Sequence, residues 1–271
     1  MSQRDGYGPG VPCWVDTWQP DLDAAVAFYA RLFGWEAEET RPPEDAGRYA
    51  VCRLHGREVA GIGTVAVEGA PPGAAWGHTV QVDDAGEAAR HATAAGGSVV
   101  TPPLQSFDGG RTAVLADPSG AVLTVWQPGS HRGARLVNEP GAWAMSMLST
   151  PDPATATPFY GELFGWEAEN FAFGEADITL WRLPGYEGGE PSQPVPADVV
   201  AAMIPAAVGE PAQWSVNFWV ADTEAAASSA AELGGAVVAE PFDTPVSRDA
   251  VLADPQGAVF SVSQIRRAQG A

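Results

Sequence analysis

Short stretches of the sequence carry aromatic and polar side chains at every second position. In residues 11–18 this alternating set is Trp14, Asp16 and Trp18. Successive side chains of a strand point to opposite faces, so such a set shares one face. Flat indole rings with a few hydrogen-bonding groups suit a planar, mostly apolar ligand, and a carboxylate suits a ligand that carries an amine. If the chain is an enzyme, Asp16 is the residue expected to transfer a proton.

The sequence lacks the residues that several other kinds of catalysis and binding require. All 14 basic residues are Arg, which excludes a Schiff-base lysine and the lysine of a Walker-type phosphate loop. There is no Ser-His-Asp order and no glycine-rich phosphate loop, and neither Cys13 nor Cys52 has an activating partner. The formal net charge of −20 disfavours nucleic acid as a partner and favours a cationic ligand.

The chain repeats itself. FYARLFGWEAE at residues 28–38 returns as FYGELFGWEAE at 159–169, and VLADPSGAVLTV at 114–125 returns as VLADPQGAVFSV at 251–262. We therefore expect one domain at 1–130, a linker at 131–141 and a second copy at 142–271. The offset between the copies grows from 131 to 138, so the second copy holds seven extra residues. The Gly/Pro-rich stretch 184–198 is their expected place, as a surface loop or, less favoured, a lid.

Each copy has the same order of elements. The first copy begins with a strand at 11–18, then a helix at 21–33 with Asp21 as N-cap and Gly34 as C-cap, then strands at 35–39, 48–54 and 58–67. The pattern restarts with a strand at 76–82, a helix at 85–95 and strands at 98–101, 111–116 and 121–127. The chain thus holds four βαβββ modules. Pro158 falls inside the first helix of the second copy and predicts a kink or a shortened helix there.

These motifs, FYxxLFGW after a strand and a capping Asp and DPxGxxxxV at the end, occur twice over residues 11–264. Their order resembles the vicinal oxygen chelate superfamily, which includes glyoxalase I, bleomycin and fosfomycin resistance proteins and extradiol dioxygenases. More narrowly, the chain resembles two-domain actinobacterial proteins that are often labelled glyoxalase-like or hydroxylase, some of which accompany antibiotic pathways. The resemblance implies an α+β fold in which each pair of modules forms a curved, cupped mixed sheet with helices outside. Because single-domain relatives dimerise to build their cavities, we expect this chain to be a monomer with a pseudo-twofold axis.

Members of the superfamily usually hold a divalent metal with His and Glu or Gln on the concave face of the sheet. The corresponding positions in the two copies are Trp14, Gly77 and Thr124, and Met145, Ser215 and Ser261. Indole, glycine and thioether groups do not ligate such an ion, and isolated hydroxyls are poor ligands. We therefore expect no metal and no other cofactor. His78 is one residue from a ligand position, so it should point away from the concave face as a satisfied structural histidine, unless a bulge shifts the register. His55, His91 and His131 are interpreted as loop or helix-surface residues.

The resemblance places the alternating side chains of each copy on the concave face of its cupped sheet. The predicted ligand-binding residues are Trp14, Asp16, Trp18, Thr79, Gln81, Arg111, Thr124 and Trp126 in the first copy, and Met145, Met147, Asn217, Trp219 and Ser261 in the second. The alternative for each aromatic or Met residue is packing in a core or a domain interface. Arg111 and its counterpart Arg248 could bind a carboxylate at the cavity mouth or pair with a neighbouring Asp.

Two functions from different classes follow. The favoured one is a metal-free binding protein that sequesters a flat aromatic, cationic natural product, such as an antibiotic-type polyketide, for self-resistance or relief of product inhibition. The alternative is a metal-independent enzyme of the same superfamily, an isomerase, hydroxylase or lyase that acts on a related aromatic substrate. A metal-dependent lyase or dioxygenase is the least favoured. The sequence has no signal-peptide pattern and no apolar run of membrane length, so we expect a cytoplasmic protein with reduced thiols and no membrane partner.

Overall fold

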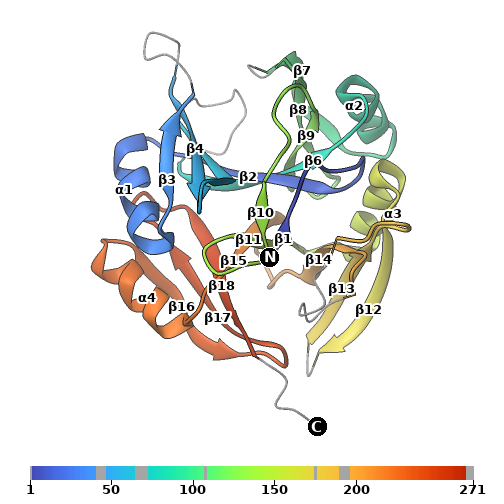
Figure 1. Cartoon of the computed structure of the whole chain (residues 1–271). Helices are drawn as coiled ribbons and strands as arrows, with labels where there is room; N and C mark the ends of the chain where they lie inside the picture. Colours follow the sequence, from blue (N-terminus) through green and yellow to red (C-terminus); the bar gives the residue numbers. More distant parts are fainter. Residues whose placement is uncertain are drawn as a thin grey trace.

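Two eight-stranded mixed sheets, one from each copy, make up most of the molecule (Figure 1). The computed structural model describes residues 2–40, 47–64, 73–106, 109–173, 176–188 and 196–266. In the first sheet the strands lie in the order β3 (Glu36–Glu39), β4 (Tyr49–Leu54), β5 (Arg57–Gly63), β2 (Pro12–Trp18), β6 (Ala75–Gln81), β9 (Val122–Gln127), β8 (Arg111–Ala116) and β7 (Ser98–Gln105). The second sheet repeats this order with β12 (Glu167–Phe173), β13 (Ala176–Arg182), β14 (Val199–Pro205), β11 (Trp143–Thr150), β15 (Gln213–Trp219), β18 (Val259–Ile265), β17 (Ser247–Ala253) and β16 (Ala236–Asp243). The expected fold class, two tandem copies with cupped mixed sheets, is confirmed.

The two modules of each copy meet at the centre of its sheet. There β2 pairs antiparallel with β6, and β11 pairs antiparallel with β15. On the outer side of each central strand the pairing is parallel, as for β2 with β5 and β6 with β9. The residues of β2, β6 and β9 that were predicted to share a face are therefore brought onto neighbouring strands.

The helices begin and end largely where the sequence predicts. They are α1 (Leu22–Phe33), α2 (Ala85–Ala94), α3 (Pro153–Phe164) and α4 (Thr223–Glu232). The Asp21 side chain accepts a hydrogen bond from the Ala24 N–H, and Gly34 ends α1 with a φ of 76°. Of the two outcomes expected at Pro158, the shortening of α3 is wrong, since α1 and α3 both have 12 residues, and the kink stays a prediction. Buried side chains on α3, Phe159 and Tyr160 among them, hold the helix against the core, which offsets the lost backbone hydrogen bond.

Both hydrophobic cores are shared between the copies. The first core joins α1, β2, β4 and β5 of the first copy to α4, β15, β17 and β18 of the second. The second core joins α2, β8 and β9 to α3, β11, β13 and β14. Figure 1 shows the same exchange, with α1 beside α4 on one side of the molecule and α2 beside α3 on the other. The Phe33 and Phe218 rings, for example, pack across the copies with centroids 5.0 Å apart.

The repeated sequence motifs also hydrogen-bond across the copies. The Tyr29 hydroxyl donates to Asp254 Oδ2 at 2.9 Å and accepts from the Trp76 indole at 2.9 Å. In the other direction the Tyr160 hydroxyl donates to Asp117 Oδ2 at 3.0 Å and accepts from the Trp214 indole at 2.9 Å. The Asp of each DPxG motif also accepts backbone N–H groups of its own turn. The FY and DP motifs therefore hydrogen-bond the two copies to each other.

The Trp of each LFGW motif fixes the backbone in front of the other copy's first strand. Trp35 donates to the Gly141 carbonyl and Trp166 donates to the Gly10 carbonyl, both at 2.7 Å. Gly10 and Gly141 have φ angles of 77° and 84°, and a Cβ on Gly10 would lie 2.7 Å from the Phe164 carbonyl. Gly10 ends the N-terminal segment and Gly141 ends the linker. These two segments pair with each other through β1 (Ser2–Gln3) and β10 (Leu136–Val137). Within the described ranges, no helix has the length and apolar character needed to cross a membrane.

Candidate functional site

The floor of the first cup is aromatic, with one carboxylate in the middle. Trp14, Asp16 and Trp18 alternate on β2, and Tyr49 reaches them from β4. The Trp14 indole donates to the Tyr49 hydroxyl at 2.9 Å, and that hydroxyl lies 3.4 Å from Asp16 Oδ2. Trp18 packs on Tyr49 with ring centroids 5.9 Å apart. The sequence predicted the three β2 residues but missed Tyr49, which alternation places on this face only once the β4–β5 register is known.

Two glycines of β5 make room for these rings. Gly61 and Gly63 lie beside Asp16 and Trp18 in the parallel β2–β5 pair. A Cβ on Gly61 would lie 1.9 Å from the Tyr49 hydroxyl, and one on Gly63 would lie 2.5 Å from the Trp18 ring. The aromatic side chains therefore lie flat on the strand, which only glycine allows at this distance.

Asp16 is the side chain of this floor with the clearest capacity for proton transfer. Burial raises the pKa of its carboxyl to about 7, and the hydrogen bond from Tyr49 opposes that shift only in part. A carboxyl with this pKa is present in both protonation states near neutral pH. It can donate a hydrogen bond to a ligand, accept one, or move a proton.

A linker histidine covers the indoles. The His131 ring stands edge-on to Trp14 with centroids 4.6 Å apart and lies 5.5 Å from the Trp126 ring. Its Nε2 is 3.4 Å from a carboxylate oxygen of Glu58. Trp14 and Trp126 are consequently only 6% and 7% exposed, and the two indoles that were predicted to bind a ligand contact a ring of the chain itself. The sequence placed His131 correctly in a loop, but the linker has no periodicity from which its contact with Trp14 could be predicted.

An open hollow adjoins His131. It has a volume of about 530 Å³ and lies between β4, β5 and the linker. We call it the first hollow; its walls include Val51, Arg53, Arg57, Glu58, His131, Arg132 and Arg135. None of the residues predicted to bind a ligand in the first copy lines it directly, but Trp14 and Trp126 lie immediately behind His131.

The other predicted residues of the first copy divide between the cup and its outside. Thr79 and Thr124 lie side by side in the β6–β9 register. The Gln81 side chain is occupied by a hydrogen bond to the Tyr7 carbonyl at 2.6 Å. Arg111 is exposed at the start of β8 and does not line the first hollow.

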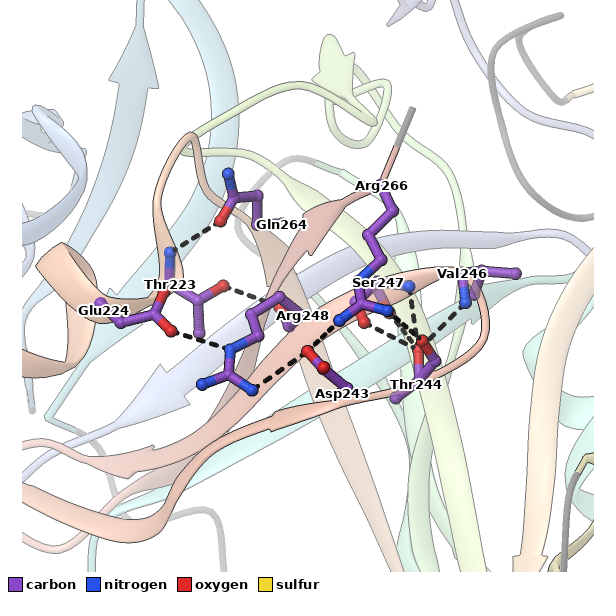
Figure 2. Close-up of polar contacts among 9 residues, drawn as sticks. All are labelled: Thr223, Glu224, Asp243, Thr244, Val246, Ser247, Arg248, Gln264 and Arg266. Atoms are coloured by element: carbon purple, nitrogen blue, oxygen red, sulfur yellow. Dashed lines mark hydrogen bonds and ion pairs between the residues drawn. The ribbon is translucent and has the colours of Figure 1, made fainter. Parts of the chain in front are cut away.

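Arg248, the counterpart of Arg111, pairs with neighbouring carboxylates. Figure 2 shows its guanidinium between Glu224, at 2.8 Å, and Asp243, at 3.0 Å. Arg266 contacts the same Asp243 carboxylate from the end of β18 (Figure 2). Of the two roles considered for this arginine, pairing with a nearby acid is confirmed.

The second cup is lined by polar groups that bond to one another. The Asn217 amide donates to Ser261 Oγ at 2.9 Å and to Ser263 Oγ at 2.7 Å. Met145, Met147 and Trp219 are half-buried beside them. Asp249, which the sequence analysis did not single out, faces Ser263 across the β17–β18 pair, and burial raises the pKa of its carboxyl.

A second hollow lies next to Met145. Its volume is about 50 Å³, and its walls include Arg4, Tyr7, Asn138, Trp143, Met145 and Tyr186. Tyr186 belongs to the insertion predicted at residues 184–198, of which the stretch 189–195 lies outside the described residues.

The side chains at the expected metal positions do not fit a metal. Trp14 and Thr124 offer an indole and a lone hydroxyl, and Asp16 is the nearest carboxylate to the Gly77 position in the β2–β6 register. Within the described part of the chain, no group of three or more His, Cys, Asp or Glu side chains is arranged to hold an ion. His78 points away from the cup, as predicted, and stacks on Trp214 of the second copy with centroids 4.0 Å apart. Neither of its ring nitrogens has a hydrogen-bond partner among the described residues, so the expectation of a satisfied histidine is wrong; burial lowers its pKa to about 3.

Comparison with known proteins assigns the family. Residues 14–125 match the glyoxalase/bleomycin resistance protein/dioxygenase superfamily, and residues 133–263 match the glyoxalase-like domain. CFP32 of Mycobacterium tuberculosis, a glyoxylase by provisional name, is 38% identical over 268 residues, which cover 97% of both chains. The chain belongs to this superfamily.

A relative with a different name matches nearly the whole length of the chain. DauV of Streptomyces sp. strain C5, named an anthracycline biosynthesis protein, is 33% identical over 276 residues, which cover 97% of this chain and 96% of DauV. Among solved structures, a Mn(II)-bound glyoxalase from Novosphingobium aromaticivorans superposes with a TM-score of 0.63 over 97% of this chain and 83% of its own, at 16% identity. This last likeness shows the fold alone. The predicted membership of the superfamily is confirmed.

Proposed function

We propose that the protein binds a flat aromatic natural product in its first copy without a metal, and that it sequesters this compound rather than converting it. The observation that carries the proposal is the aromatic cup floor beside an open hollow of about 530 Å³. That volume falls within the range of ordinary small-molecule sites. The 33% identity to a protein named for anthracycline biosynthesis supports a polycyclic aromatic ligand.

Affinity would come from burial and ring contacts. A ligand ring that packs on His131 and Val51 fills the first hollow, and one that displaces His131 gains the Trp14 and Trp126 faces in its place. Such aromatic contacts contribute about 0.5–1.5 kcal/mol each beyond the buried area. Asp16 would meet a hydroxyl or an amine of the ligand. Sequestration of this kind would serve self-resistance or relief of product inhibition.

A second candidate function is metal-independent catalysis. The observation that favours it is Asp16, since a carboxyl with a pKa of about 7 beside a tyrosine hydroxyl is suited to proton transfer at neutral pH. In that case the chain would be an isomerase, hydroxylase or lyase for a related aromatic substrate.

Titration with an anthracycline tests both functions. We expect it to quench tryptophan fluorescence on binding and to be recovered with its mass and retention time unchanged. Conversion to a new compound that is lost in Asp16→Asn would support the enzyme instead. If the anthracycline does not bind at concentrations up to about 100 μM, its affinity is weak, and that result would contradict the sequestration proposal.

Matched histidine variants locate the site. His131→Ala should change the affinity for the anthracycline, because the ring that covers Trp14 is removed. His91→Ala, at an exposed position on α2, is the control and should bind normally. Equal behaviour of the two variants would place the ligand elsewhere.

A further inference from the structure

The first hollow is basic although the chain is acidic. Among the residues that the structure describes, four arginines line it, Arg53, Arg57, Arg132 and Arg135, and one acidic residue, Glu58. Two of these arginines come from β4 and β5, and two from the linker that crosses the cup. The potential that a bound molecule meets depends on these nearby charges, whereas the net charge of −20 averages over the whole surface.

Among the described residues, two of these arginines contact acids and two do not. Arg53 contacts Glu38 and lies 3.2 Å from Glu58, and Arg135 pairs with Asp5 at 3.0 Å. Asp5 is fully exposed, and such a surface pair contributes little. Arg57 and Arg132 make no ion pair with any residue that the structure describes. Their guanidinium groups are available to a ligand.

The second hollow contains the repeat counterpart of one arginine of the first hollow, but it is much smaller. Arg135 and Gly141 of the linker correspond to Arg4 and Gly10 of the N-terminal segment at the offset of 131, and Arg4 lines the second hollow as Arg135 lines the first. The second hollow is about 50 Å³ against about 530 Å³. Tyr186, from the insertion that the first copy lacks, occupies its wall. Its volume is far below the range of ordinary small-molecule sites, so we expect no molecule of several rings to bind there.

We infer that the chain binds one ligand, in the first hollow, and that this ligand presents a carboxylate or a similar planar oxyanion to Arg57 and Arg132 while its ring packs on His131. Guanidinium groups match such an anion with paired, charge-assisted hydrogen bonds. The inference rests on the proposed binding of an aromatic compound, and it replaces the cationic ligand expected from the net charge with an anionic one.

Two probes that share one ring system test the charge preference. Anthracene-9-carboxylate and 9-(aminomethyl)anthracene are titrated into the full chain, and ligand fluorescence gives affinity and stoichiometry. We expect one equivalent of the carboxylate to bind, at least about tenfold more tightly than the ammonium compound. Tighter binding of the ammonium compound, or two equivalents of the carboxylate, would overturn the inference.

Charge-matched variants test the residues. The double variant Arg57→Gln/Arg132→Gln should weaken carboxylate binding by about 10- to 100-fold, in line with the loss of charged hydrogen bonds, and leave the ammonium probe unaffected. Arg31→Gln/Arg90→Gln removes the same charge from exposed positions on α1 and α2 and should leave both probes unchanged. An equal loss in both double variants would mean that only overall charge matters, and would contradict the site. If an anthracycline binds while neither anthracene probe does, the anionic site fails and the proposed function stands. If the carboxylate binds as expected and no anthracycline does, the anionic site stands and the proposed function fails.

Discussion

Replacement of Asp16 by Asn should stabilise the fold at alkaline pH and leave its stability in acid unchanged. Burial raises the folded-state pKa of this carboxyl from 3.8 to about 7, while the unfolded chain keeps the ordinary pKa. Above about pH 7 the group is ionised in both states, so the folded state carries the full cost of the buried charge. Below about pH 4 it is protonated in both states and the cost vanishes. The native protein should therefore gain stability from this group as the pH falls from 7 to 4.

The size of the effect follows from the shift. Three pKa units correspond to about 4 kcal/mol at 1.36 kcal/mol per unit. Asp16 is half-buried, so solvent screening reduces this figure, and we expect Asp16→Asn to add about 1–3 kcal/mol at pH 8. The Asn side chain keeps the shape of Asp and an oxygen that can accept from Tyr49, so no packing is lost.

Urea unfolding of the full chain at pH 4, 6 and 8, followed by circular dichroism, measures the difference. Asp83→Asn, at an exposed position with the same change in charge, is the control and should shift stability by no more than about 0.5 kcal/mol. A loss of stability in Asp16→Asn at pH 8, or an equal gain at all three pH values, would refute the reasoning. The expected result would mark Asp16 as a residue that is retained in spite of its cost to the fold, which is typical of functional groups.

Two further predictions concern the contacts between the copies. Tyr160→Phe should destabilise the protein by about 2–4 kcal/mol, and by more than Tyr29→Phe does. The reason is that the Asp254 oxygen that accepts from Tyr29 also accepts from Gln19 at 2.7 Å and so keeps a partner. Equal losses of stability in thermal unfolding would count against this. His78 should have the opposite pH signature to Asp16, since its folded pKa of about 3 means that stability is lost as the pH falls from about 6.5. His78→Phe should flatten this loss of stability in acid by up to about 5 kcal/mol, and an unchanged loss would refute the assignment.

The sequence predicted those features that are local. Asp21 and Gly34 mark the ends of α1 by their own chemistry, and alternation on β2 is enough to bring Trp14, Asp16 and Trp18 to one face. The repeat identified the fold because the spacing of its motifs depends on the lengths of the elements between them.

What the sequence did not predict depends on contacts between distant segments. Tyr160 meets Asp117 only because the copies exchange halves of their cores, and no pattern within one copy indicates that exchange. His131 lies on Trp14 because of the path of an irregular linker. The arginines of the first hollow come from a hairpin and from that linker, so the charge of the hollow could not be predicted from that of the chain.

The shared cores have a consequence for synthesis on the ribosome. When the first copy has emerged, neither of its two modules can complete its core, because the facing elements belong to residues that have not yet been translated. Rings such as Phe28 and Phe33 stay uncovered until β15 to β18 follow. This is the interval in which chaperones would engage the nascent chain and aggregation would begin. A stop codon after the first copy would accordingly produce an insoluble fragment, although that fragment would contain every residue of the first cup.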